Sequence, residues 1–135
     1  MGDSEWLAIL GSAEIMKDAY TSPPDQSECR LHYFQIDERE ASVTFGFDTS
    51  RLPSKAPADW RVKGYNTVEF YVKFTGVKQL RASGWDFTVR DAEVSLTRLE
   101  DEGLSVSLAS EGAHISFVAA RVLIPRVRSY LAGQE

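Results

Sequence analysis

The chain has 135 residues, of which 43% are hydrophobic and 26% charged, and its formal net charge is −5. This length predicts a single domain over residues 1–135, with enough apolar residues for a core that needs neither disulfides nor a metal. The composition excludes wholesale disorder, no apolar run reaches the roughly 18 residues of a membrane span, and the acidic balance argues against a nucleic-acid partner.

The N-terminal residues predict a helix that ends near Tyr20. Asp3 or Ser4 can cap its start. Apolar residues then recur at steps of three and four, the spacing of one helix face: Trp6, Ile9, Leu10, Ala13, Met16 and Tyr20. We expect this face to pack on a sheet, with the two large aromatic residues in the core. A proline-containing turn, Thr21–Gln26, ends the helix.

Two strands and a tight turn follow, which together predict a β-hairpin. The first strand is Cys29–Asp37, whose apolar residues fall on both faces, and the second is Ala41–Asp48, which alternates more cleanly. Cys29 is the single cysteine, which excludes an internal disulfide and fits the reducing cytoplasm, where we expect the protein to reside.

The stretch from Tyr65 to Leu99 predicts the centre of an antiparallel sheet. Apolar and polar residues alternate from Val68 to Thr75, as in a strand with one buried face. A turn at Thr75-Gly76 and a second strand over Asp91–Leu99 follow. The connection before Tyr65, Thr49–Lys63, is long and irregular. Its Trp60 is either a core anchor or an exposed contact residue.

The C-terminal part predicts two further strands and a short helix. Leu104–Ala109 and Ile115–Ala119 alternate between apolar and small or polar residues, and Ser110–Gly112 turns the chain between them. After Ala119 the apolar spacing lengthens, which favours a short helix with Pro125 in its first turn. The chain is therefore predicted to be α+β, mostly β: an N-terminal helix packed on an antiparallel meander of about seven strands.

Motifs that would identify an enzyme or a cofactor site are absent from the sequence. It contains no glycine-rich phosphate loop, no CxxC, no HExxH and no GxSxG. With two histidines and one cysteine, we expect no structural zinc site and predict no cofactor. A small hydrolase built on His32 or His114 remains an alternative, to be judged by whether either histidine lies beside a carboxylate in a cleft.

Two acidic clusters lie at predicted hairpin tips. The first contains Asp37, Glu38 and Glu40, and the second contains Glu100, Asp101 and Glu102. They are either solubilising turn charges or an acidic patch that docks a basic protein surface. In the second case Trp60 and Tyr71 are candidate aromatic anchors. The polar face of the central strand, Glu69, Tyr71 and Lys73, is either solvent surface or part of the docking platform.

Several short motifs follow one another in a set order: the N-terminal tryptophan, Tyr20 with Pro23-Pro24, Pro57 with Trp60, Asn66, Phe74 with Gly76-Val77, and Gly84-Trp85. This order resembles the immunity protein 50 family of bacterial polymorphic toxin systems. The resemblance runs from Trp6 to about Tyr130. It implies a non-enzymatic cytoplasmic protein that binds a cognate toxin and occludes its active surface, without catalytic residues. The charge and the hydropathy predict neither a nucleic-acid nor a membrane partner, and we expect a monomer or a homodimer paired through an edge strand. A β-rich module that binds a small ligand or a regulatory protein is the alternative.

Overall fold

The computed structural model describes residues 28–50, 67–84, 93–100, 103–110 and 112–125, the backbone of 127–130, and Trp6, Ala8, Ile9, Tyr20 and Pro24. This part of the chain contains nine strands: β1 (Cys29–Asp37), β2 (Ser42–Thr49), β3 (Thr67–Thr75), β4 (Lys78–Ser83), β5 (Glu93–Arg98), β6 (Leu104–Ser110), β7 (Ala113–Ala119), β8 (Arg121–Leu123) and β9 (Val127–Tyr130). Within these residues, no helix is long and apolar enough to cross a membrane.

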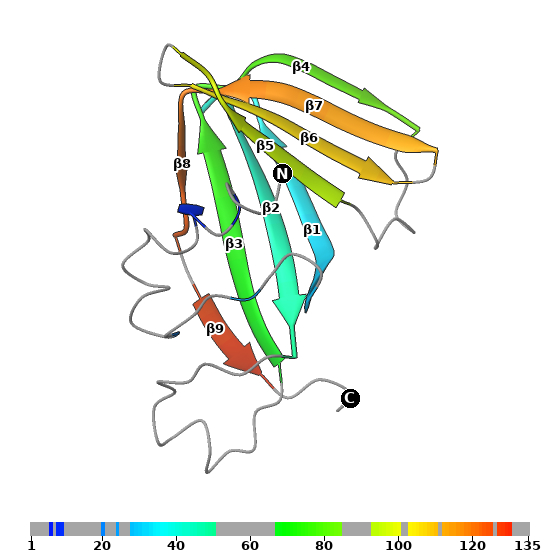
Figure 1. Cartoon of the computed structure of the whole chain (residues 1–135), viewed down its shortest axis with the longest axis vertical. Helices are drawn as coiled ribbons and strands as arrows, with labels where there is room; N and C mark the ends of the chain where they lie inside the picture. Colours follow the sequence, from blue (N-terminus) through cyan, green and yellow to red (C-terminus); the bar gives the residue numbers. More distant parts are fainter. Residues whose placement is uncertain are drawn as a thin grey trace.

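The strands form two antiparallel sheets (Figure 1). In sheet A, β2 lies between β1 and β3, and β8 and β9 both pair with the other side of β3. In sheet B the order is β4-β7-β6-β5. The long strands of sheet A run down the molecule in Figure 1, and sheet B crosses their upper end.

The predicted α+β class is wrong for the described residues, whose elements are all strands. Most of the segment predicted as an N-terminal helix lies outside these residues, and only Trp6, Ala8 and Ile9 are described with helical backbone. The prediction that its apolar residues enter the core is confirmed for Trp6, Ile9 and Tyr20, which are buried. Trp6 packs edge-on against Phe47 of β2.

The single meander is also wrong, because the chain changes sheet at one corner of the molecule. β3 ends in sheet A and β4 pairs with β7 in sheet B, so the turn at Gly76 joins two sheets and not two paired strands. Gly76 has a φ of +64°, and a Cβ there would lie 2.6 Å from that of Ala120. Ala120 is where β7 leaves sheet B for β8, and its N–H donates to the carbonyl of Thr75 at 2.9 Å.

The predicted C-terminal helix is replaced by an interrupted edge strand. β8 pairs with Lys73–Thr75 and β9 with Thr67–Phe70, so both lie along β3. Pro125 lies between them and lacks an N–H to donate to the ladder, which explains the break in pairing at this point. The alternation-based strands are confirmed as β1, β2, β3, β5, β6 and β7.

Phenylalanine rings join the two sheets in one core. Phe45 of β2 and Phe74 of β3 lie 5.6 Å apart, and Phe117 of β7 lies 6.0 and 5.3 Å from them respectively. All of these side chains are at most 2% exposed. Valine and leucine side chains of β5 and β6 belong to the same cluster, so burial of apolar surface holds sheet B on the inner face of sheet A.

Replacing Phe45 with alanine tests this contact between sheets. Removing a fully buried phenylalanine costs about 3–5 kcal/mol of unfolding free energy through lost burial and the cavity left behind. Ile36 is a matched control, because it lies on the neighbouring strand but is 42% exposed. Urea denaturation should show a large loss for Phe45→Ala and a loss of about 1 kcal/mol or less for Ile36→Ala. Equal losses would contradict the described core.

Candidate functional site

Polar, charged and tyrosine side chains of the described residues gather on the outer face of sheet A, the side opposite the core. Alternate residues of each strand point to this side. Pairing places Thr44, Gly46 and Asp48 of β2 directly opposite Lys73, Tyr71 and Glu69 of β3. Tyr33 and Gln35 of β1 pair with Gly46 and Thr44 on the same side.

A β-bulge adds His32 to this face. Leu31 pairs with Phe47 and Tyr33 with Gly46, so His32 is an extra residue in β1 with no partner in the pairing register of β2. A bulge of this kind bends a strand and redirects a side chain. The bulge explains why the apolar residues of β1 fall on both faces when strict alternation is assumed.

Gly46 makes room for the histidine. A Cβ at this position would lie 2.7 Å from Cβ of Tyr33, 2.9 Å from Cε1 of Tyr71 and 3.2 Å from Nε2 of His32. The absence of a side chain on the middle strand lets the imidazole of β1 reach across β2 towards β3.

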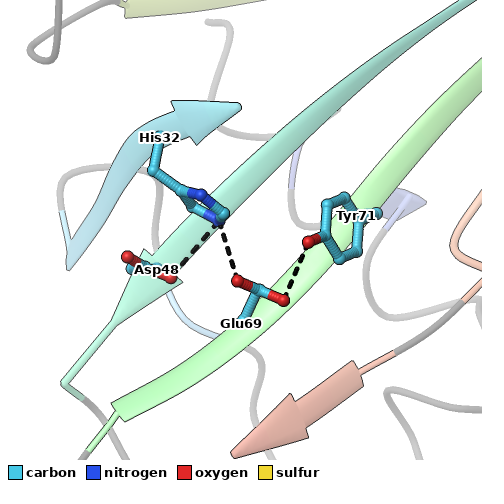
Figure 2. A network of polar contacts seen from close by, with 4 residues as sticks. All are labelled: His32, Asp48, Glu69 and Tyr71. Atoms are coloured by element: carbon cyan, nitrogen blue, oxygen red, sulfur yellow. Dashed lines mark hydrogen bonds and ion pairs between the residues drawn. The ribbon is translucent and has the colours of Figure 1, made fainter. Parts of the chain in front are cut away.

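The imidazole lies between two carboxylates (Figure 2). Nε2 of His32 is 3.3 Å from Oδ1 of Asp48 and 3.4 Å from Oε2 of Glu69. The hydroxyl of Tyr71 donates a hydrogen bond of 2.8 Å to Oε1 of Glu69. His32, Asp48 and Glu69 come from three adjacent strands. Each offers a ligand atom within 4.8 Å of the others, which is close enough to hold a metal ion.

Burial sets this cluster apart from ordinary surface charges. The side chain of Glu69 is 7% exposed, and those of His32 and Asp48 are each 26% exposed. The alternation predicted Glu69 on the polar face, and it does lie there, but it is not part of an open solvent surface. A carboxylate this buried is stable only when it is paired and hydrogen-bonded.

The contacts of the two histidines differ, and the two residues lie on different sheets. His32 meets two carboxylates and the ring of Tyr71. A serine or cysteine nucleophile, which acyl transfer requires, is not among the contacts described for it. His114 lies on sheet B, where its Nε2 is 3.1 Å from Oγ of Ser107, and this pair is exposed. His32 therefore lies beside carboxylates, as the hydrolase alternative requires, and His114 lies beside a serine, but neither histidine has both groups among its described contacts.

The first acidic cluster forms the β1–β2 turn. Oδ1 of Asp37 accepts hydrogen bonds from the backbone N–H groups of Arg39 and Glu40, at 2.9 and 3.2 Å. Asp37 therefore stabilises the turn, as aspartate commonly does. Glu38 is exposed. Oε2 of Glu40 lies 2.6 Å from Nζ of Lys73 on the outer face.

The fold brings the end of the β5–β6 turn to the same end of the molecule. The β1–β2 turn accepts a hydrogen bond at Ala41 from Val77, just after the corner at Gly76. Gly103, at the end of the β5–β6 turn, lines a hollow of ≈520 Å³ together with Gly76. Glu100 of that turn is exposed. Trp60, Asp101 and Glu102 lie outside the described residues.

A second hollow, of ≈410 Å³, lies on the outer face itself and is lined by Tyr33, Gln35, Thr44, Tyr71, Lys73 and Pro125. The rings of Tyr33 and Tyr71 meet edge to face with centroids 5.5 Å apart. Tyr71 therefore belongs both to this hollow and to the carboxylate cluster beside it.

A comparison with protein families agrees with the resemblance seen in the motifs. The family model described as immunity protein 50 matches residues 12–130. The chain belongs to this family. Comparisons with curated proteins and with solved structures find no match.

Sequence patterns only partly indicated the cluster. His32 and Glu69 were singled out separately, for catalysis and for the polar face, whereas Asp48 was missed. The signals that point to it are the irregular alternation at His32 and the isolated Gly46 within a strand that otherwise alternates between apolar and polar residues. Their coincidence indicates a close approach, but only the register shows which carboxylates meet there.

Replacing Tyr71 with phenylalanine tests the support of the buried carboxylate. Loss of a hydrogen bond to a buried charged group costs about 1–3 kcal/mol of unfolding free energy. Tyr33→Phe is the matched control, because Tyr33 lies on the same face but is 39% exposed. In urea denaturation we expect the loss for Tyr71→Phe and a change within about 0.5 kcal/mol for Tyr33→Phe. A neutral Tyr71→Phe would contradict the described role of the hydroxyl.

Proposed function

We propose that the protein binds a cognate bacterial toxin and neutralises it by covering the toxin's active surface, without a catalytic step of its own. The observation that carries this proposal is the family match over residues 12–130. Immunity of this kind requires a stable surface complementary to the toxin and no reaction. We place this activity in the cytoplasm of the producing cell.

The outer face of sheet A is the docking surface that the geometry supports best. It combines a hollow with two tyrosines, Tyr33 and Tyr71, whose rings support each other. Tyrosine is enriched at the energetic centres of interfaces because it buries a large area with few rotatable bonds. Tyr33 is 39% exposed, so it has surface left to bury against a partner.

Acidic residues border this face and favour a basic partner. Asp37, Glu38 and Glu40 lie at the β1–β2 turn, and the ion pair of Glu40 with Lys73 joins that turn to the hollow. Opposite potentials on two proteins speed their encounter and orient it. We assign the same steering role to Glu100, Asp101 and Glu102, and a role in binding to Trp60, as extensions of the same proposal.

The small-ligand alternative has less support. A hollow of ≈410 Å³ falls in the size range of ligand sites. Such sites are lined mainly by apolar side chains, whereas Gln35, Thr44 and Lys73 line this one. A polar and aromatic lining fits a protein surface better than a small apolar molecule.

Co-expression with the cognate toxin tests the function. Cells that produce the toxin together with the wild-type protein should grow, and the two proteins should copurify. Cells that produce the toxin alone should not grow. Survival without copurification would contradict neutralisation by binding, and failure of both protection and copurification would overturn the proposal.

Tyr33→Ala tests the docking surface and keeps both Glu69 and the Tyr71 hydroxyl that binds it. A central tyrosine contributes about 2 kcal/mol or more, so Kd for the toxin should rise at least about 30-fold. Leu80→Ala on β4 is the matched control, since Leu80 is a large apolar residue of similar exposure, 37%, on sheet B. Calorimetric titration should separate the two variants. Equal affinities would exclude Tyr33 from the interface.

A further inference from the structure

We propose that His32, Asp48 and Glu69 form a zinc-binding site on the outer face of sheet A. The ligand atoms are Nε2 of the histidine and one oxygen of each carboxylate. This site is independent of the proposed toxin binding, because it rests on side-chain geometry alone. Its donors include no thiolate, which is why counting cysteines and histidines did not indicate it.

Two of the three distances between the ligand atoms fit tetrahedral zinc better than hydrogen bonds, and the third, between the two carboxylates, is within 4.8 Å. Nε2 of His32 lies 3.3 Å from Oδ1 of Asp48 and 3.4 Å from Oε2 of Glu69. A charge-assisted N–H···O bond is shorter, about 2.7–2.9 Å. Atoms about 2.05 Å from a tetrahedral zinc ion are about 3.3–3.4 Å from one another, which matches both separations.

Two of the three ligand atoms are buried without a hydrogen bond. Nε2 of His32 and Oδ1 of Asp48 are shielded from solvent, and neither makes a hydrogen bond to any residue that the structure describes. Buried polar atoms of this kind are rare in native proteins and destabilise the fold. A zinc ion placed between them would satisfy both atoms at once.

The charges of the cluster also call for a cation. Asp48 and Glu69 are direct cross-strand partners, and like charges in this position are destabilising. A divalent ion bound between the two carboxylates would lower this repulsion. Two arginines are cross-strand partners of the pair: Arg30 of β1, with an exposed side chain, pairs with Asp48, and Arg128 of β9 pairs with Glu69.

Neighbouring residues hold the ligands in place, as the surroundings of metal sites usually do. The hydroxyl of Tyr71 binds Oε1 of Glu69 and leaves Oε2 turned towards the histidine (Figure 2). Gly46 and the bulge in β1 bring the imidazole across the middle strand. The partial exposure of His32 and Asp48, 26% each, gives an ion a path from solvent.

The donor set favours zinc over calcium and magnesium. Imidazole is a poor ligand for calcium and magnesium, which prefer oxygen alone. Octahedral magnesium at about 2.1 Å would also bring neighbouring ligand atoms to about 3.0 Å, closer than the observed separations. Three protein ligands leave a fourth position on tetrahedral zinc for water or for a donor from a bound molecule.

Thermal unfolding of the whole chain tests the site with zinc alone. Protein purified with a chelator and then freed of it should bind one equivalent of Zn²⁺ in calorimetric titration. With free zinc at a hundred times Kd, the Tm should rise by about 8 °C. Magnesium at the same concentration should leave the Tm unchanged. Cobalt(II), which reports coordination by its visible absorption, should give the intense spectrum of a tetrahedral site.

Variants locate the ion. Asp48→Asn and His32→Gln should each abolish the zinc-dependent rise in Tm, whereas Tyr71→Phe should weaken zinc binding about 10- to 100-fold. His114→Gln and Cys29→Ser are the controls, because they remove the other histidine and the single cysteine, and both should keep the full response. The proposal is overturned if the wild-type protein does not bind zinc or gives an octahedral cobalt spectrum. Both measurements use the wild-type protein, so they do not depend on whether a variant folds. Loss of binding in either control, or its retention in Asp48→Asn, would overturn it as well.

Discussion

The contact of Phe45 and Phe74 with Phe117 determines which side of sheet A faces the core, and the polar side follows from it. Side chains in a strand alternate, so a register shift of one residue would exchange the two faces. With these rings inside, Asp48 and Glu69 must both point outward and opposite each other. The apolar core therefore fixes the position of the carboxylate pair, although neither carboxylate contributes to it.

Two local irregularities turn that pair into a cluster. Regular alternation in β1 would place one side chain beside each position of β2, whereas the bulge at His32 places both His32 and Tyr33 near Gly46. The glycine is needed because a Cβ at position 46 would meet three neighbouring side chains. Bulges and strand glycines weaken a sheet. Their combination at one point is consistent with a site where geometry matters more than local stability.

Local patterns predicted the strands well because a strand with one buried face has a two-residue period that neighbours alone reveal. Val68, Phe70, Val72 and Phe74 predicted β3 and its buried side correctly. Strand partners were not predictable in this way. β4 is exposed throughout, so its sequence carries no period that would assign it to β7, and the corner at Gly76 depends on Ala120, which lies far along the chain.

The candidate site was less accessible to sequence analysis for the same reason. His32, Asp48 and Glu69 come from three strands, and their meeting depends on a bulge and on the register between β2 and β3. The interrupted edge strand is a contrasting case. There, the cause of the interruption is local, because Pro125 has no N–H to donate to the ladder. The helical spacing of the apolar residues around it nevertheless predicted a helix, which was wrong. Long-range pairing decided both outcomes.

Tyr71 connects the two features of the outer face. Its ring lines the hollow and meets Tyr33, and its hydroxyl holds the buried carboxylate of Glu69. An interaction that fixes Glu69 also restricts the Tyr71 ring, and ordering a side chain before association lowers the entropy lost on binding. Such coupling is reciprocal, so a partner that fixes the Tyr71 ring would favour the same arrangement of Glu69. Tyr33 shares the hollow without touching the carboxylates, which is why substitutions at the two tyrosines separate docking from the electrostatics beneath it.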